Sequence, residues 1–469
     1  MLNYIWLALI VLSVAIGGWN DRLKDVTDGA FDGAKTAVTI ALGLIGVMAL
    51  WLGVMRLAER AGLVQAIARG LRPLLRRLFP DVPPDHPAMG SMVMNMAANM
   101  LGLGNAATPL GLRAMRDLES LNRRPGIATN AMCTFLAINT ASVQLIPTTA
   151  IALLVASGSK RPTAIVGTAL LATMCAATVA ITAVKLLEKL PFFRAKGTSD
   201  GEPGDAHARE RFAEGHAPAE PPTSTTRDAS SAGASPFPLV APAMAGTGPR
   251  RPTILGKLAL AALALFFAVI FTRLVFPELF GFPVDPNAAG QNGFIRSVNA
   301  FSLLAIPFLL SFFPVYAATR GIKVYDEFVE GAKEGFGVIL KIIPFLVTML
   351  VAISMFKGAG GIDLLTRALT PILAPLHFPP DLLPLALMRP LSGSGTLAIL
   401  TDIIHRLGPD NIVTLMAATI YGSTETTFYV AAVYFGSVGV TQTRHAILAG
   451  LLADLAGVVA SVILCRAVL

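Results

Sequence analysis

The stretch MLGLGNAATPLGL, residues 100–112, interrupts a long apolar part of the chain with residues that favour turns and hydrogen bonds. Glycine and proline weaken or break helices, and a broken helix leaves backbone N–H and C=O groups without partners. Inside a lipid bilayer these groups have no water to bond, so non-helical backbone persists there only where protein or a polar cavity covers it. If this part of the chain lies in a membrane, the interruption predicts a site.

The composition predicts a membrane protein. Of the 469 residues, 54% are hydrophobic and 14% are charged, whereas about one quarter of the residues of a soluble domain are charged. The mean hydropathy is +0.65. The first apolar run lacks a basic start and a cleavage site, so we expect a retained span rather than a signal peptide. The runs that fit the length of a membrane span are 4–18, 34–58, 126–155, 162–188, 253–275, 299–319, 337–356, 411–438 and 442–465.

Several other classes of protein do not fit the sequence. The net charge is +8, but the basic residues are not clustered with aromatic ones, so we expect no nucleic-acid partner. The three cysteines stand singly in apolar runs, which favours core positions over a disulfide or a metal site. No phosphate-binding loop or H-E-x-x-H helix occurs. We therefore expect no enzyme, no catalytic residues and no metal ligands.

A polar segment divides the chain into two apolar halves. Residues 196–250 are rich in Gly, Ala, Ser, Thr, Pro and mixed charges, a composition that cannot bury a core. Basic residues flank this segment, which indicates the cytoplasmic side. We predict a first membrane half at 1–190, a disordered cytoplasmic linker at 191–252 and a second membrane half at 253–469.

The two halves repeat the same order of features. DGAKTAVTIALGLIG at 32–46 resembles EGAKEGFGVILKIIP at 330–344, and each half later contains a glycine-broken stretch followed by an apolar run with polar residues inside it. Basic residues of the first half (Arg69, Arg72, Arg76, Arg77, Arg123 and Arg124) favour a cytoplasmic position, whereas the segment matching the first four of them carries only Arg367. With the N-terminus inside, the positive-inside rule then favours two inverted repeats with re-entrant or broken helices. Two parallel bundles with fully spanning hairpins are the alternative.

Several sequence segments also resemble those of a known family. MNMAANMLGLGNAATPLGLRAM and GAKTAV in the first half are similar to the spore maturation A proteins, and EGAKEGF, RPLSGSG and IYGSTETTFYV in the C-terminal half are similar to the spore maturation B proteins. Both groups belong to the nucleoside-recognition, or Gate, family, so the chain resembles a fusion of the two. The resemblance implies a bacterial, multi-pass protein of the inner (plasma) membrane with Gate-type hairpins and broken helices around a substrate.

The first glycine-broken stretch offers hydrogen-bonding side chains. Asn105 and Thr108 lie beside its glycines, and a half-helix starting near Thr108 would point its positive end into the membrane. Asn95 and Asn99 are four residues apart, which places them on one helix face. These residues either line a substrate site or cap and join helices within the bundle.

The second half contains charged residues at membrane depth. Arg389 precedes the stretch with Ser392, Ser394 and Thr396, and its guanidinium suits a carboxylate or phosphate; snorkelling or an internal ion pair is the alternative. Glu425 lies in an otherwise uncharged run, which is costly unless it faces a cavity, binds a cation or pairs, for instance with Arg389. The other candidates in the first polar-interrupted run are Asn139, Thr140 and Gln144. In the second run, Ser423, Thr424, Thr426 and Thr427 could supply oxygen ligands to a sodium ion beside Glu425. Asp402 and Asp454 are expected to be helix-end or interhelical hydrogen-bond partners.

Together these features favour a secondary transporter or exporter. We expect a small polar or anionic metabolite as substrate, bound near the midplane between the two repeats. No cofactor is expected beyond a coupling Na+ or H+, and the partners are the lipid bilayer and the substrate, with homo-oligomerisation left open. The alternative is a non-transporting membrane factor in spore or cell-envelope (peptidoglycan) maturation.

Overall fold

The computed structural model describes residues 2–102, 104–193, 252–281, 291–361, 364, 367 and 378–469. Of the linker predicted at 191–252, residues 194–251 lie outside the described residues. Within the described residues the chain is almost entirely helical, with one isolated bridge between Ile127 and Gln442. The first-half helices are α1 (Leu2–Trp19), α2 (Leu23–Arg60), α3 (Leu63–Leu78), α4 (Pro87–Met100), α5 (Gly104–Glu119), α6 (Asn130–Ala141), α7 (Thr148–Ala156), α8 (Ile165–Leu187) and η1 (Pro191–Phe193). The second-half helices are α10 (Ile254–Val275), η2 (Pro277–Phe280), α11 (Gly293–Thr319), α12 (Val324–Gly358), η5 (Pro380–Leu382), α14 (Leu383–Met388), α15 (Gly393–Leu407), α16 (Ile412–Ser423), α17 (Thr427–Gly436) and α18 (Ala446–Val468).

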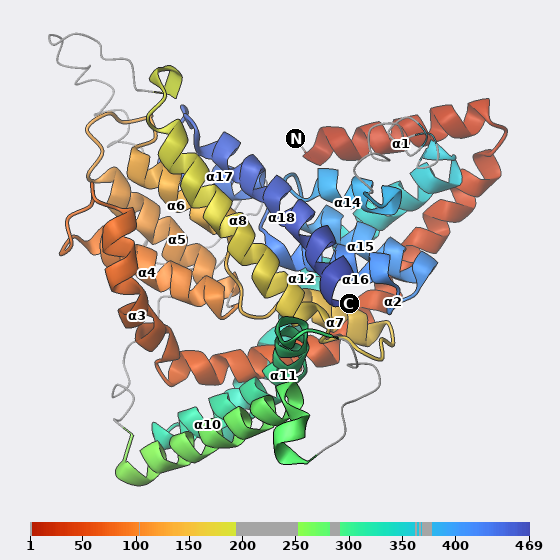
Figure 1. The fold of residues 1–469 in the computed structure, drawn as a ribbon. Coiled ribbons are helices and arrows are strands. Elements are labelled where there is room, and N and C mark those ends of the chain that lie inside the picture. The colour runs from red at the N-terminus through yellow and green to blue at the C-terminus, as the bar shows by residue number, and fades with distance from the viewer. Residues whose placement is uncertain are drawn as a thin grey trace, which may run out of the picture. The chain divides into compact units, whose positions relative to one another are not determined.

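Five of the described helices are long and apolar enough to cross a bilayer: α2, α8, α10, α11 and α18. The chain is therefore a helical, multi-pass membrane protein. The apolar runs predicted at 126–155 and 411–438 are each divided into two short helices, α6 and α7 in the first half and α16 and α17 in the second. Figure 1 shows α8, in yellow, and α18, in blue, running side by side across the molecule, and the two helices pack against each other.

The two longest helices, α2 and α12, pack antiparallel over most of their length. A Cβ atom added to Gly33 would lie 2.7 Å from the carbonyl oxygen of Leu350, and one added to Gly331 would lie 2.5 Å from that of Leu52. These glycines belong to the repeated GAK segments. Leu52 follows Gly33 by the same number of residues as Leu350 follows Gly331. Each helix thus contacts the other through equivalent positions, and only glycine allows the backbones to come this close.

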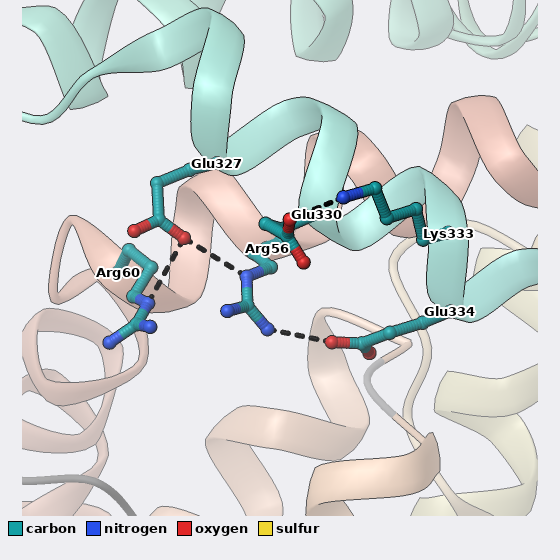
Figure 2. Close-up of polar contacts among 6 residues, drawn as sticks. All are labelled: Arg56, Arg60, Glu327, Glu330, Lys333 and Glu334. Atoms are coloured by element: carbon teal, nitrogen blue, oxygen red, sulfur yellow. Dashed lines mark hydrogen bonds and ion pairs between the residues drawn. The ribbon is translucent and has the colours of Figure 1, made fainter.

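One end of the α2–α12 pair carries a cluster of ion pairs (Figure 2). The Nε atom of Arg56 lies 3.0 Å from Glu327, and its Nη1 atom lies 2.6 Å from Glu334. Arg60 also pairs with Glu327, at 3.2 Å. Because two arginines and two glutamates share these contacts, the cluster joins the C-terminal end of α2 to the N-terminal half of α12.

Two helical hairpins complete the fold. In the first half α4 packs on α5, after a turn in which Gly102 has a φ of 73°. In the second half α14 packs on α15 around the turn at 389–392. The first hairpin's helices have 14 and 16 residues, or about 21–24 Å at 1.5 Å per residue. They are therefore shorter than the roughly 30 Å hydrocarbon core of a bilayer.

Loops from the two halves meet at the helix ends. Asp410, in the loop after α15, accepts hydrogen bonds from the Ser159 hydroxyl at 2.6 Å and the Lys160 backbone at 3.0 Å. These bonds, the Ser159 one first, hold the pKa of the Asp410 carboxyl below its ordinary value. In another group of loops, Arg444 donates to the Ala128 carbonyl at 3.1 Å and to Asn130 at 2.8 Å.

Candidate functional site

The first interruption of a membrane helix lies between α6 and α7. α6 ends at Ala141, where Ser142 adopts a left-handed conformation with a φ of 32°. α7 begins after Pro147, which has no N–H to continue a helical ladder. Residues 142–147 are therefore non-helical, and we call them the first break.

The second interruption lies between α16 and α17, at Thr424, Glu425 and Thr426, and we call it the second break. It contains neither glycine nor proline; its short polar and β-branched residues instead favour extended backbone. The two breaks adjoin each other, because the backbone N–H of Glu425 donates to the carbonyl of Thr140, at the end of α6, at 2.7 Å. Each interruption thus helps to satisfy backbone groups that the other leaves unpaired.

A cavity of about 80 Å³ lies beside these breaks. The N-terminal ends of α7 and α15 contribute Thr149 and Gly393 to its wall, and helix N-termini carry partial positive charge. Together with an arginine in the wall, they make the cavity suited to an anion or to a carbonyl or hydroxyl oxygen. The lining residues are Gln144, Pro147, Thr149, Arg389, Gly393, Tyr421, Gly422 and Glu425.

Arg389 is the buried cation of this cavity, with a side chain only 3% exposed. Its Nη1 atom donates to the hydroxyl of Thr426 at 3.3 Å, and its Cζ atom lies 5.2 Å from the centre of the Tyr421 ring. Its Nε atom has no hydrogen-bond partner among the described residues. A guanidinium is a donor only, so the Nε–H of Arg389 is free to bond a ligand in the cavity.

Glu425 lines the same cavity as Arg389, but the two are only loosely paired. Their closest charged atoms are 4.0 Å apart, and the Glu425 side chain is 42% exposed. Glu425 instead accepts a hydrogen bond from the amide of Gln144 at 3.0 Å. The structure therefore brings together three residues singled out from the sequence, one from the first break, one from the second and one from the turn between α14 and α15.

The asparagines form a second polar group, which the cavity wall does not include. Asn99 donates to Asn139 at 2.9 Å, and Asn95 donates to the Ala107 carbonyl at 2.8 Å. The hydroxyl of Tyr434, on α17, joins them, at 3.3 Å from Asn95 and 3.4 Å from Asn139. No sequence signal pointed to Tyr434, which lies in an ordinary aromatic and apolar run, and Tyr421 was also not singled out.

Three of the predicted residues organise the start of α15. Ser392 caps the helix by accepting from the Gly395 N–H at 3.0 Å and lies 3.3 Å from the Ser394 hydroxyl, while Thr396 donates to the Ser392 carbonyl at 2.6 Å. These contacts are local, and Gly393 is the member of this segment that lines the cavity.

The remaining candidates lie in the second break and in helices around the breaks. Thr108 is half-buried in α5, and the side chain of Asn105 lies outside the described part of the chain. Ser423 and Thr424 are buried, and Ser423 donates to the Ile420 carbonyl of its own helix. Asp402, on α15, forms ion pairs with Lys357 at 3.2 Å and Arg406 at 2.8 Å.

Comparison with known proteins identifies the family of the chain. The family described as "Gate: Nucleoside recognition" matches residues 41–188 and 339–441, more than half of the chain. The chain belongs to the Gate family. The two matched regions include both breaks, the cavity and Arg389, so the candidate site is built from the Gate parts of the chain, whereas α10 and α11 lie outside them.

Two curated relatives match different parts of this Gate protein. Spore maturation protein A of Bacillus subtilis (strain 168) is 46% identical over 196 residues, which are 42% of this chain and 98% of the relative. Spore maturation protein B of the same organism is 43% identical over 167 residues, which are 36% of this chain and 94% of the relative. No solved structure matches the chain. The resemblance to both kinds of spore maturation protein is thus confirmed.

Proposed function

We propose that the protein is a secondary transporter of a small polar metabolite that carries an anionic group. The substrate binds in the cavity beside the two breaks. The protein lies in the inner (plasma) membrane of a bacterial cell. Arg389 carries this proposal. A guanidinium that is 3% exposed, lines a cavity and has no partner for its Nε–H among the described residues is costly in a membrane protein unless something else pairs with it.

An arrangement of two inverted repeats supports transport. The reciprocal contacts of Gly33 with Leu350 and of Gly331 with Leu52 are those expected of equivalent helices related by a two-fold axis. The short hairpins α4–α5 and α14–α15 are then re-entrant, one entering from each side of the membrane. In transporters with inverted repeats, the substrate binds where the broken helices of the two halves meet.

The size of the cavity requires movement during transport. A volume of about 80 Å³ holds two or three water molecules at about 30 Å³ each, whereas ligand pockets usually measure about 300–1,000 Å³. A metabolite therefore enters only when the hairpins or the broken helices move apart. The hydrogen bond between Gln144 and Glu425 then breaks, and both side chains bond the substrate instead.

A ligand screen on the purified full-length protein tests the proposal. Nucleosides, carboxylates and phosphate esters are added singly, and the melting temperature is measured; a ligand that binds only the folded protein raises it. We expect at least one anionic metabolite to raise the melting temperature and to exchange across vesicles containing the protein. Arg389→Gln should lose both effects, whereas Arg113→Gln, at an exposed position, should keep them.

The names of the relatives support a second function. Both are called spore maturation proteins, and a non-transporting factor of envelope maturation would bind another envelope protein rather than a metabolite. In that case no metabolite changes the melting temperature, no exchange occurs, and an envelope enzyme co-purifies with the chain. This outcome, or an Arg389→Gln variant that still binds and exchanges the metabolite, would contradict the transport proposal.

A further inference from the structure

Helix α18 places one buried carboxyl group against the second break and the start of α17. Asp454 is 2% exposed, and its Oδ2 atom accepts a hydrogen bond from the hydroxyl of Thr427, the first residue of α17, at 2.5 Å. Glycines one turn before and one turn after it let α18 approach this region closely. A Cβ atom on Gly450 would lie 3.0 Å from the Thr427 hydroxyl and 3.3 Å from the Thr140 hydroxyl, and one on Gly457 would contact the Thr424 methyl group at 2.6 Å.

Several oxygen atoms in this region are buried without a hydrogen-bond partner among the described residues. They are Oδ1 of Asp454 and the hydroxyl oxygens of Thr424 and Thr140. Thr424 interacts with the Asp454 side chain, and the Thr140 hydroxyl lies near that of Thr427. Oxygen-bearing side chains of α6, the second break and α17 thus lie along the face of α18 that carries Gly450 and Asp454.

The corresponding contact in the first half of the chain differs. Thr173, on α8, faces the first break and donates to the carbonyl of Ala141 at 2.8 Å, so protein groups alone satisfy its hydroxyl. Asp454 has no such complete set of partners. The charged groups that act on it through space are Arg389 and Glu425, with opposite signs.

We propose that Asp454, Thr424, Thr427 and Thr140 bind a sodium ion. Oxygen atoms are the ligands that hard cations prefer, and a single carboxylate among neutral hydroxyls balances one positive charge rather than two. In membrane transporters, unwound segments of broken helices commonly coordinate Na+. This site is distinct from the cavity, whose wall includes none of the four residues.

Thermal stability of the purified full-length protein in different salts tests the site. The melting temperature is measured with increasing NaCl, with choline chloride holding the ionic strength constant, and KCl is tested in parallel. Because Na+ binds the folded site, we expect NaCl to raise the melting temperature to a plateau and KCl to have a smaller effect at equal concentration. Asp454→Asn should abolish the increase.

A second set of variants keeps the test decisive if Asp454→Asn does not fold. Thr424→Val and Thr140→Val remove hydroxyls with little change of shape, and each should raise the Na+ concentration at the midpoint by about tenfold or more. Thr178→Val is the matched control, since Thr178 is exposed on α8 and bonds only its own helix. It should leave the Na+ midpoint unchanged.

Several results would overturn the inference. If Na+ and K+ change the melting temperature equally, or if Na+ has no effect at any pH, the site binds no sodium. If the melting temperature then depends on pH and Asp454→Asn abolishes this dependence, Asp454 binds a proton instead. Loss of the sodium response in Glu425→Gln, with the response kept in Asp454→Asn, would place the ion in the cavity. Transport is a separate question, because a sodium-stabilised protein that carries no metabolite would retain this inference and contradict only the proposed function.

Discussion

Among single residues, the loose contact between Arg389 and Glu425 determines the interpretation of the cavity. A structural ion pair would place the two charges within hydrogen-bond distance, whereas here they are 4.0 Å apart and Glu425 bonds Gln144 instead. Buried pairs that are broken commonly cost about 3–5 kcal/mol, but pairs with a solvent-accessible partner contribute about 0–1 kcal/mol. The pair of Arg389 and Glu425 belongs with the pairs that have a solvent-accessible partner.

Glu425→Gln should therefore fold and fail in function. We expect its free energy of unfolding to fall by less than about 1 kcal/mol. Substrate binding and exchange should fall by about tenfold or more, because the cavity loses a carboxylate that accepts hydrogen bonds from the polar groups of the substrate. Membrane yield, melting temperature and exchange are measured together. A strongly destabilised single variant that Arg389→Gln rescues would instead make the pair structural.

Among the secondary-structure elements, close backbone contact between α2 and α12 holds the two halves together. The contact depends on glycine at a few positions, whereas glycines on the outer faces of the same helices have open space around them. Gly46 and Gly337 have no neighbouring atom within 4 Å of an added Cβ atom. The same residue type is thus required at some positions of one helix and replaceable at others.

Alanine substitutions should separate these two kinds of glycine. Gly33→Ala and Gly331→Ala force the helices apart, and we expect each to lower the free energy of unfolding by about 1–3 kcal/mol. Gly46→Ala and Gly337→Ala should be neutral or raise stability by up to about 1 kcal/mol, since alanine is the better helix former. Melting temperatures in one detergent compare the four variants. Equal effects at all four positions would contradict the close-contact role.

Across the molecule as a whole, loops of the two halves meet in two groups. Asp410 contacts the loop of Ser159 and Lys160, and Arg444 contacts Ala128 and Asn130. Under the predicted topology the first group lies outside the cell and the other inside. The same topology places Arg69 and Arg367, which occupy matching positions in the repeated segments, on opposite sides of the membrane.

Cysteine labelling measures this orientation. Arg69→Cys and Arg367→Cys are made singly in a chain whose three native cysteines are replaced by alanine; both positions are exposed. An impermeant thiol reagent added to intact cells should label the cysteine at 367 at once and the one at 69 only after permeabilisation. Lys160→Cys is the control for an outside position. Labelling of 69 and 367 from the same side would support parallel bundles and rule out the inversion.

The membrane class, the family and most of the polar residues of the candidate site follow from the amino-acid sequence without knowledge of packing. They depend on local properties, because a long apolar run and a polar residue inside it are visible in the chain itself. The apolar run at 411–438 shows the limit: its polar residues were recognised, but its division at residues 424–426 carries no glycine or proline that would predict it. The extended backbone at residues 424–426 is stable because the N–H of Glu425 donates a hydrogen bond to the carbonyl of Thr140, nearly three hundred residues earlier in the chain.

Which of these polar residues meet depends on tertiary packing and could not be predicted. Asn95 and Asn139 share Tyr434, Gln144 contacts Glu425, and Asp454 contacts Thr427, and each of these contacts joins different helices. Helical periodicity states which residues share a face, but it does not state which face of another helix lies opposite. That choice depends on close packing between distant segments, for which small residues such as Gly450 and Gly457 leave the space that brings Asp454 to the second break.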